Sequence, residues 1–231
     1  MKNSEIVRIS GMVKRFPVAR GYFTALNDIN ITFEEGEFAG LVGPSGSGKT
    51  TMLNIIGSLD TPSEGEAIVL GQSIGEMTAK GAARLRKQSL GFIFQSYNLL
   101  AVHTVFENVE FPLLLLDYQS GERKKMVMDA LEWVGLADKA KSKPSQLSGG
   151  ECQRVAIARA MVKKPTIVLA DEPTANLDAD NSHNILRTMK KLNHDLKTSF
   201  LFATHDEKVI SYLNRKIILL DGKIDRDELV N

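Results

Sequence analysis

One stretch decides the fold of this chain, a glycine-rich loop between an apolar run and an apolar helical segment. The stretch reads Gly43, Pro44, Ser45, Gly46, Ser47, Gly48, Lys49 and Thr50. It follows the apolar residues 38–42 and opens a segment with helical spacing that reaches residue 56. Glycines let successive backbone N–H groups point inward at phosphate oxygens, and the start of a helix attracts anions. A strand, this loop and a helix in that order predict a phosphate-binding site.

The two residues after the last glycine indicate which phosphates bind. Lys49 places a point charge at the β- and γ-phosphates of a nucleotide, and the Thr50 hydroxyl suits Mg²⁺. A glycine-rich turn that binds nothing is the alternative. Such a turn has no need of Lys-Thr at the start of a helix, so the pattern favours a nucleoside triphosphate.

Length and composition limit what such a site can serve. The chain has 231 residues, of which 43% are hydrophobic, enough for the core of one α/β domain. The formal net charge of +1 and the scattered basic clusters give no electrostatic case for a nucleic-acid partner. One cysteine excludes an intrachain disulfide and suits a reducing compartment. Since the apolar runs are short and no signal region opens the chain, we expect a protein that neither spans a membrane nor is exported.

Strand patterns surround the glycine-rich loop. Alternating apolar residues within 5–42 predict a small sheet that leads into the loop. Further strands are expected at 67–70, 91–94, 167–170, 199–203 and, as the last strand, 216–220.

Residues 96–163 change character. Apart from 111–116 they have helical patterns and no strong strand pattern. Helices are expected at 121–134, 150–163 and, further along the chain, 181–196. We therefore expect a single domain, 1–231, in which a helical lobe (96–163) is inserted into a β and α/β core lobe formed by 1–95 and 164–231.

Two adjacent carboxylates, Asp171 and Glu172, end the apolar run 167–170. The carboxyl end of a parallel strand places them at the sheet edge where the phosphate loop lies. Asp171 suits Mg²⁺, directly or through water, and Glu172 suits the water that attacks a γ-phosphate. A solvated acidic turn is the alternative. His205 follows another strand and can sense the γ-phosphate there, although a lone histidine is more often structural.

A second helix start, at Ser148, also has features of an anion site. Ser148 and Glu151 fit the S-x-x-E capping box, which by itself explains a well-made helix start. Gly149 and Gly150 cost helix stability with no local return, and a phosphate that approaches their backbone N–H groups would explain them. We also expect the helix start to lower the pKa of the Cys152 thiol, and we expect its alkylation to block hydrolysis of the bound triphosphate. A small, packed side chain is the alternative for Cys152.

Together these motifs resemble the ATP-binding subunits of ABC transporters over nearly the whole length. The matching segments are 43–50 (Walker A), Gln95 (Q-loop), 147–151 (signature motif), 167–172 (Walker B with its glutamate), 175–178 (D-loop) and His205 (switch histidine). The resemblance implies an α/β fold of the P-loop NTPase (ABC ATPase) type, with an N-terminal antiparallel β subdomain and an inserted helical subdomain. It also implies ATP and Mg²⁺ as cofactors.

The resemblance assigns roles residue by residue. It implies that Glu172, His205 and Gln95 are catalytic, and that Thr50, Gln95 and Asp171 hold the metal. The nucleotide-binding residues it implies are Phe16, Gly43, Pro44, Ser45, Gly46, Ser47, Gly48, Lys49, Thr50, Thr51, Ser148, Gly149, Gly150 and Asp178. Phe16 lies where the family has an aromatic ring that stacks on adenine; Tyr22 and Phe23 are competitors, and core packing explains all three rings equally well.

Within the family, residues 91–95, 107–109 and 169–178 resemble the lipoprotein-releasing, macrolide-exporting and cell-division branch, and Glu151 favours the lipoprotein-releasing type. This implies a translocase ATPase, peripheral at the cytoplasmic face of the inner membrane, that powers an integral membrane permease for lipoproteins, peptides or drugs. An ATP-gated recruiter without cargo transport is the alternative. A DNA-repair or translation ATPase would have paired cassettes, coiled-coil arms or zinc cysteines, and none is present. The run 113–116 either faces the membrane partner or is buried.

The chain has two phosphate-binding helix starts, at Lys49 and Ser148, whereas each ATP has one triphosphate. Because the phosphate loop already surrounds it, we expect the second start to serve ATP held by a second copy of the chain. Head-to-tail pairing in a closed two-fold dimer gives two composite sites with ATP between the subunits. ATP binding would close this dimer and hydrolysis would open it.

Overall fold

An antiparallel sheet opens the chain, which the computed structural model describes over residues 4–230. Its strands, in spatial order, are β2 (Gly21–Glu34), β1 (Glu5–Val18), β4 (Glu64–Val69) and β5 (Gln72–Ser73). Along β2, Ile29, Ile31 and Phe33 are buried while the residues between them are exposed, the period of a half-buried strand. The expected antiparallel β subdomain is therefore confirmed.

A second sheet carries the phosphate loop. Its strands, in spatial order, are β10 (Lys223–Leu229), β9 (Arg215–Leu220), β3 (Phe38–Val42), β8 (Ser199–Thr204), β7 (Ile167–Asp171) and β6 (Leu90–Ile93). The strands from β9 to β6 are parallel, and β10 pairs antiparallel with β9. The parallel strands read as apolar runs because both faces of the sheet are covered. Their carboxyl ends meet at one edge.

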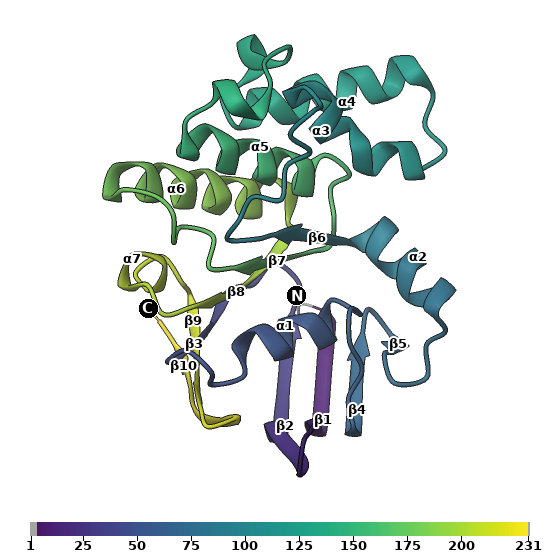
Figure 1. Cartoon of the computed structure of the whole chain (residues 1–231), viewed down its shortest axis with the longest axis vertical. Coiled ribbons are helices and arrows are strands. Elements are labelled where there is room, and N and C mark those ends of the chain that lie inside the picture. Colours follow the sequence, from purple (N-terminus) through teal and green to yellow (C-terminus); the bar gives the residue numbers. More distant parts are fainter. Residues whose placement is uncertain (1–3, 231) are drawn as a thin grey trace.

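Helices cover the two faces of this sheet (Figure 1). The helices are α1 (Lys49–Ile56), α2 (Ala79–Ser89), α3 (Val105–Glu110), α4 (Ser120–Trp133), α5 (Gly149–Met161), α6 (Ala179–Leu196) and α7 (Glu207–Ile210). Short 3-10 turns lie at Phe111–Leu115, Ala137–Lys139 and Pro144–Gln146. Helix α1 packs between the two sheets, and α3, α4 and α5 gather at the other end of the molecule.

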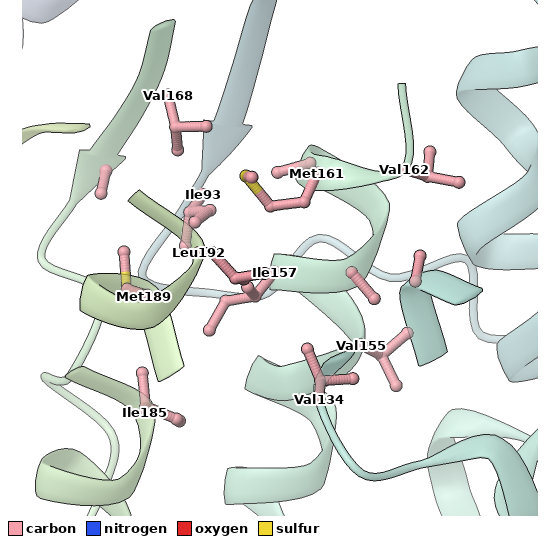
Figure 2. Packing of buried hydrophobic residues seen from close by; sticks show 14 of the residues in the cluster. Ile93, Val134, Val155, Ile157, Met161, Val162, Val168, Ile185, Met189 and Leu192 are labelled. Atoms are coloured by element: carbon pink, nitrogen blue, oxygen red, sulfur yellow. The ribbon is translucent and has the colours of Figure 1, made fainter. Parts of the chain in front are cut away.

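Two apolar cores hold these layers together. One fills the space between the sheets around α1, and the other joins α5 and α6 to the opposite face of the second sheet. In Figure 2, Ile157 and Met161 of α5 point toward Leu192 and Ile93, while Val155 lies beside Val134. Each fully buried aliphatic side chain contributes about 1.5–3 kcal/mol to stability. Helix α5 is therefore fixed against the sheet that carries the site.

The structure differs from the sequence predictions in several places, since β10, α2, β5 and α7 were not predicted. The prediction that residues 216–220 form the last strand is wrong, because β10 follows them; its residues are almost all exposed and polar, so they lack an apolar period. Helix α2 was not predicted because Leu85 is its only buried residue. Within the apolar run 113–116, Leu113 is buried while Leu114 and Leu115 are exposed, so burial explains only part of this run.

Candidate functional site

The glycine-rich loop turns the chain from β3 into α1, and its glycines have steric reasons. Gly46 and Gly48 have φ of 82° and 102°, a region that favours glycine. A Cβ atom on Gly43 would lie 2.2 Å from the carbonyl oxygen of Leu219, and one on Gly48 would lie 2.7 Å from that of Ala25. The loop is thus closely fitted to β2 and β9.

Lys49, the first residue of α1, is folded over this loop. Its ammonium group donates hydrogen bonds to the carbonyl oxygens of Gly43 and Pro44, both at 2.8 Å. Burial lowers the pKa of Lys49 below the usual lysine value, while the carboxylates of Glu172 and Asp171 oppose this shift. The lysine therefore concentrates positive charge at the mouth of the loop, where phosphate oxygens would lie.

Thr50 and Asp171 come together from α1 and the end of β7. The Thr50 hydroxyl donates to Asp171, with distances of 3.0 Å to Oδ2 and 3.2 Å to Oδ1. Burial raises the pKa of Asp171, as does the neighbouring Glu172, whereas the Thr50 hydrogen bond and Lys49 act in the opposite direction. A hydroxyl oxygen beside a carboxylate is a donor set that Mg²⁺ accepts together with phosphate oxygens.

Glu172 and His205 meet across the ends of β7 and β8, whose Asp171 and Ala203 are paired. His205 Nδ1 lies 2.6 Å from Oε1 of Glu172, and the Thr204 hydroxyl donates to Oε2 at 3.1 Å. With the proton of the imidazole on Nδ1, this contact leaves Nε2 available to a further group. The backbone of Glu172 has a φ of 45°, uncommon for a residue other than glycine, and its N–H donates to the Ala203 carbonyl at 2.9 Å.

Gln95 lies at the same edge, two residues beyond β6, which pairs with β7. Its backbone carbonyl accepts a hydrogen bond from the Asn176 side chain at 2.9 Å. Asn176 belongs to the segment that follows Glu172, so the loops after β6 and β7 are joined. A lone asparagine in a loop offers no signal of this contact in the sequence.

The second helix start has the predicted cap. Ser148 Oγ accepts from the Glu151 N–H at 3.3 Å, and Glu151 Oε2 accepts from the Ser148 N–H at 2.8 Å, so the capping box is confirmed. Gly150 has a steric reason that comes from a residue distant in the chain. A Cβ atom there would lie 2.7 Å from Oδ1 of Asn181, and one on Gly149 would lie 3.1 Å from the Tyr97 hydroxyl.

Ser148 and the phosphate loop precede helices that lie on opposite faces of the second sheet. Helix α5 packs in the core on one face of the second sheet, and α1 packs in the core on the other. Among residues 4–230, Ser148 makes hydrogen bonds within its own helix start and none to the loop. Asp178 lies near α5 in a similar position: it caps α6 by accepting from the Asn181 N–H at 2.8 Å, and this backbone hydrogen bond lowers its pKa.

The three aromatic candidates lie at the tip of the β1–β2 hairpin. Phe16 is opposite Phe23, and Pro17 is opposite Tyr22. Their exposed fractions are 36% for Phe16, 55% for Phe23 and 72% for Tyr22, so core packing explains none of them. The Lys14 ammonium lies 4.9 Å from the centroid of the Phe16 ring.

Two residues of α5, Cys152 and Gln153, differ from what the local sequence suggested. The Cys152 thiol is buried, its Sγ lies 3.7 Å from the Pro144 carbonyl oxygen, and burial raises its pKa, so the predicted lowering is wrong. Desolvation outweighs the helix start because the thiol points into the protein. Gln153, which sequence reasoning missed, is fully buried and donates to the Pro173 carbonyl at 2.7 Å, just beyond Glu172. A glutamine on an apolar helix face was the available signal.

Fold and site together define an α/β nucleotide-binding protein with a phosphate loop at the carboxyl edge of a parallel sheet. The ABC transporter family model matches residues 26–175, and the chain belongs to this family. The described residues include no helix long and apolar enough to cross a membrane.

Relatives match nearly the whole chain. It is 40% identical over 227 residues to the uncharacterized ABC transporter ATP-binding protein MJ0796 of Methanocaldococcus jannaschii, covering 96% of this chain and 97% of that protein. It is 41% identical over 224 residues to the lipoprotein-releasing system ATP-binding protein LolD of Francisella tularensis, with the same two coverages. The protein is thus an ABC transporter ATP-binding subunit related to both.

Solved structures agree with this assignment. The dimeric, post-hydrolysis structure of the MJ0796 cassette bound to ADP and Pi has a TM-score of 0.90 at 39% identity, over 98% of this chain and 99% of that one. The cbiO1 protein of Clostridium perfringens, part of the ABC transporter complex cbiONQ, has a TM-score of 0.88 at 26% identity, over 99% and 89%. The expected α/β cassette fold is confirmed.

Proposed function

We propose that this protein hydrolyses ATP and thereby drives a separate, membrane-embedded partner. The observation that carries the proposal is the Glu172 carboxylate, which Thr204 and His205 contact at the sheet edge next to Asp171. A carboxylate in that position suits the proton taken from water as it attacks the γ-phosphate. The ADP and Pi in the related MJ0796 structure are the products of such a reaction and support the proposal.

The phosphate loop fits a triphosphate. The buried Ser47 hydroxyl has no hydrogen-bond partner within residues 4–230, and a Cβ atom on Gly46 would meet open space. We assign the phosphates to residues 43–51, including Thr51, and the adenine to Phe16. Thr50 and Asp171, with Gln95, would hold Mg²⁺, which neutralises phosphate charge when bound.

Within this site the side chains divide the work. Lys49 binds the β- and γ-phosphates by charge, while Glu172 takes the proton of the attacking water. His205 contacts Glu172 through Nδ1. When Nε2 also carries a proton, the imidazolium can donate a hydrogen bond from Nε2 to a γ-phosphate oxygen. Loss of that phosphate then removes one partner of the imidazole, so His205 reports hydrolysis to the loop after β8.

A second copy of the chain completes the site. We assign Ser148, Gly149, Gly150 and Asp178 to the nucleotide of the partner subunit, in a head-to-tail dimer with two ATP molecules between the subunits. The packing of α1 and α5 on opposite faces of the sheet supports this arrangement, as do the dimeric MJ0796 structures. Each subunit would then act as one unit, with the helical lobe 96–163 inserted into the core lobe.

An apolar cavity of about 500 Å³ is our candidate site for the membrane partner. Its lining includes Leu59, Phe92, Phe94, Phe111 and Leu115, with Arg86, Lys87, Arg159 and Lys163 among the charged residues. Exposed apolar side chains continue past it at Leu114 and Val102. Such a surface suits a short amphipathic helix of an integral membrane subunit, with acidic groups that meet the basic side chains.

We propose that the cargo is a lipoprotein. The 41% identity to the lipoprotein-releasing protein LolD supports lipoprotein release, with peptide or drug export as the related class. We place the protein at the cytoplasmic face of the inner membrane, attached through its partner. The Glu172–His205 contact supports an output that requires hydrolysis.

Copurification from detergent-solubilised membranes tests this function. An integral membrane protein should elute with the tagged chain and stimulate its ATPase activity. A Leu115→Glu variant should lose this partner because a charge would enter the apolar cavity, whereas Leu229→Glu, an exposed position on β10, should retain it. Both variants should hydrolyse ATP alone at the normal rate. Binding that is unaffected by Leu115→Glu, or a partner without membrane spans, would contradict the proposed docking.

A further inference from the structure

The loop that carries Gln95 has an uncommon backbone. Tyr97 and Asn98 have φ of 58° and 49°, so two consecutive residues other than glycine lie in the left-handed region. This region is sparsely populated for residues with a side chain. Within the loop, the Tyr97 N–H donates to the Phe94 carbonyl at 3.2 Å and the Asn98 N–H donates to the Ser96 carbonyl at 2.6 Å. These two N–H groups are satisfied within the loop, whereas the carbonyls of the same two residues are bonded by a residue from elsewhere in the chain.

Arg159 of α5 supplies those contacts. Its Nη2 donates to the Tyr97 carbonyl at 2.6 Å and its Nη1 donates to the Asn98 carbonyl at 2.5 Å. A single planar guanidinium thus bridges the carbonyls of both left-handed residues, which a lysine ammonium could not do with the same geometry. Burial lowers the pKa of Arg159, and within residues 4–230 it forms no ion pair, so these carbonyls are its main compensation.

The other side of this bridge is rigid. Ile157 and Met161, two residues before and after Arg159, are fully buried in the core between the helices and the second sheet (Figure 2). Gln95, near the start of the loop, accepts a hydrogen bond at its carbonyl from the Asn176 side chain. The loop therefore has one attachment to α5 and one to the segment beyond Glu172.

We propose that Arg159 is a positioning residue for ATP hydrolysis, which holds the loop after β6 so that Gln95 reaches the metal and the attacking water. This inference rests on the proposed function, because it takes the role of Gln95 from there. Arg159 itself touches neither the nucleotide nor the reacting atoms. It acts through the backbone of Tyr97 and Asn98.

A double-mutant cycle tests the proposal. Turnover at saturating Mg·ATP is measured for Arg159→Met, Gln95→Ala and the double variant, together with the Kd of ATP and the thermal midpoint. Arg159→Met should lower kcat by about 10- to 100-fold, as expected when a reacting group is misplaced by about 1 Å. The Kd should change little, and the double variant should be no slower than the slower single variant, because Arg159 acts only through Gln95.

Three further measurements separate positioning from general damage. Arg159→Lys keeps the charge but only one of the two hydrogen bonds to the loop, so its kcat should lie between those of the wild type and Arg159→Met. This variant gives a result even if Arg159→Met is unstable. Hydrogen exchange of the amides in 95–98 should speed up in Arg159→Met while α5 keeps its protection. Arg123→Met is the matched control: Arg123 lies on α4, donates to the Tyr118 carbonyl at 2.9 Å and does not contact the loop. It should keep the normal kcat.

The outcomes distinguish the inference from the proposed function. If the losses in kcat of the two single variants multiply in the double variant, or if hydrogen exchange of the amides in 95–98 is unchanged, the positioning role of Arg159 is wrong while the proposed function stands. Normal turnover of Gln95→Ala would overturn the role of Gln95 and this inference with it. A wild-type protein that binds ATP without hydrolysing it would overturn the proposed function first.

Discussion

The Glu172 carboxylate and the His205 imidazole lie 2.6 Å apart, Oε1 to Nδ1, although 33 positions separate them in the chain. They meet because β7 and β8 are neighbouring parallel strands that end at the same edge. The contact fixes the orientation of both side chains beside Thr204. This contact joins the two residues on which the proposed hydrolysis most depends.

Glu172→Gln should stop turnover without stopping ATP binding. The amide keeps the size and the hydrogen bonds of the side chain but removes the basic carboxylate, so hydrolysis should fall by about 10²- to 10⁴-fold. Steady-state ATPase assays and ATP-binding titrations measure the two effects, and gel filtration should detect a lasting ATP-bound dimer. Glu207→Gln, an exposed neighbour of His205, is the control and should remain active. Wild-type turnover in the Glu172 variant would remove this residue from its role.

Asp171→Asn should stabilise the fold while it weakens function. Burial raises the pKa of Asp171, so the folded state favours the protonated carboxyl and the ionised form costs stability at neutral pH. The stability of the wild-type protein should therefore rise as pH falls through the raised pKa of Asp171, and fall as pH rises through it. The asparagine variant should lack this pH dependence and have a higher thermal midpoint near pH 7. The increase should be only a few degrees, because partial exposure of Asp171 to solvent screens its charge.

The functional half of this prediction concerns the metal. The asparagine side chain of the Asp171→Asn variant carries no charge, so the Mg²⁺ concentration needed for half-maximal turnover should rise about tenfold or more. Melting curves from pH 4 to pH 8 and a Mg²⁺ titration of activity are the measurements. A thermal midpoint lower than that of the wild type at every pH would show that the carboxylate stabilises the fold.

Mixing two inactive proteins should restore activity. Lys49→Ala removes the charge of the phosphate loop, and Ser148→Arg blocks the start of α5. In a dimer with shared sites, a mixed pair has both defects in one site and leaves the other intact. If each chain used its own Ser148, every site would keep one defect. ATPase activity that appears on mixing supports shared sites.

This complementation needs two controls. Native mass spectrometry must show that the mixed dimers form, and a wild-type chain paired with a Lys49→Ala chain, which leaves one site intact, must show whether one site turns over alone. With both controls satisfied, the absence of recovered activity would refute the shared site.

Cys152 should react slowly with thiol reagents. Because burial raises the pKa of its thiol, the folded protein holds little thiolate at pH 7, and labelling should be about tenfold or more slower than in the unfolded chain. The rate should keep rising as the pH increases above the ordinary pKa of a cysteine thiol, because the buried thiol ionises later. A thiol-exchange reagent followed by absorbance measures both. Fast labelling of the folded protein at neutral pH would mean that the thiol is accessible and ionised.

Several features could be predicted from the sequence because they depend on neighbouring residues. The strand, glycine-rich loop and helix at 38–56, and the Ser148–Glu151 capping box, are defined by spacings of a few positions. Backbone geometry then dictates where their N–H groups point. The apolar run before Asp171 likewise placed this carboxylate at the carboxyl edge of a buried strand.

The rest was decided by the tertiary structure, because it depends on contacts between residues far apart in the chain. The burial of Cys152 follows from packing around α5, and it reversed the direction of the pKa shift that its place in the helix suggested. Gly150 has a steric reason only because Asn181 lies against it. The Arg159 bridge to Tyr97 and Asn98 spans about 60 positions of chain. Local spacing determined which chemical groups this protein has at its site, whereas long-range packing decided how they are oriented, since only the folded sheet brings distant loops to one edge.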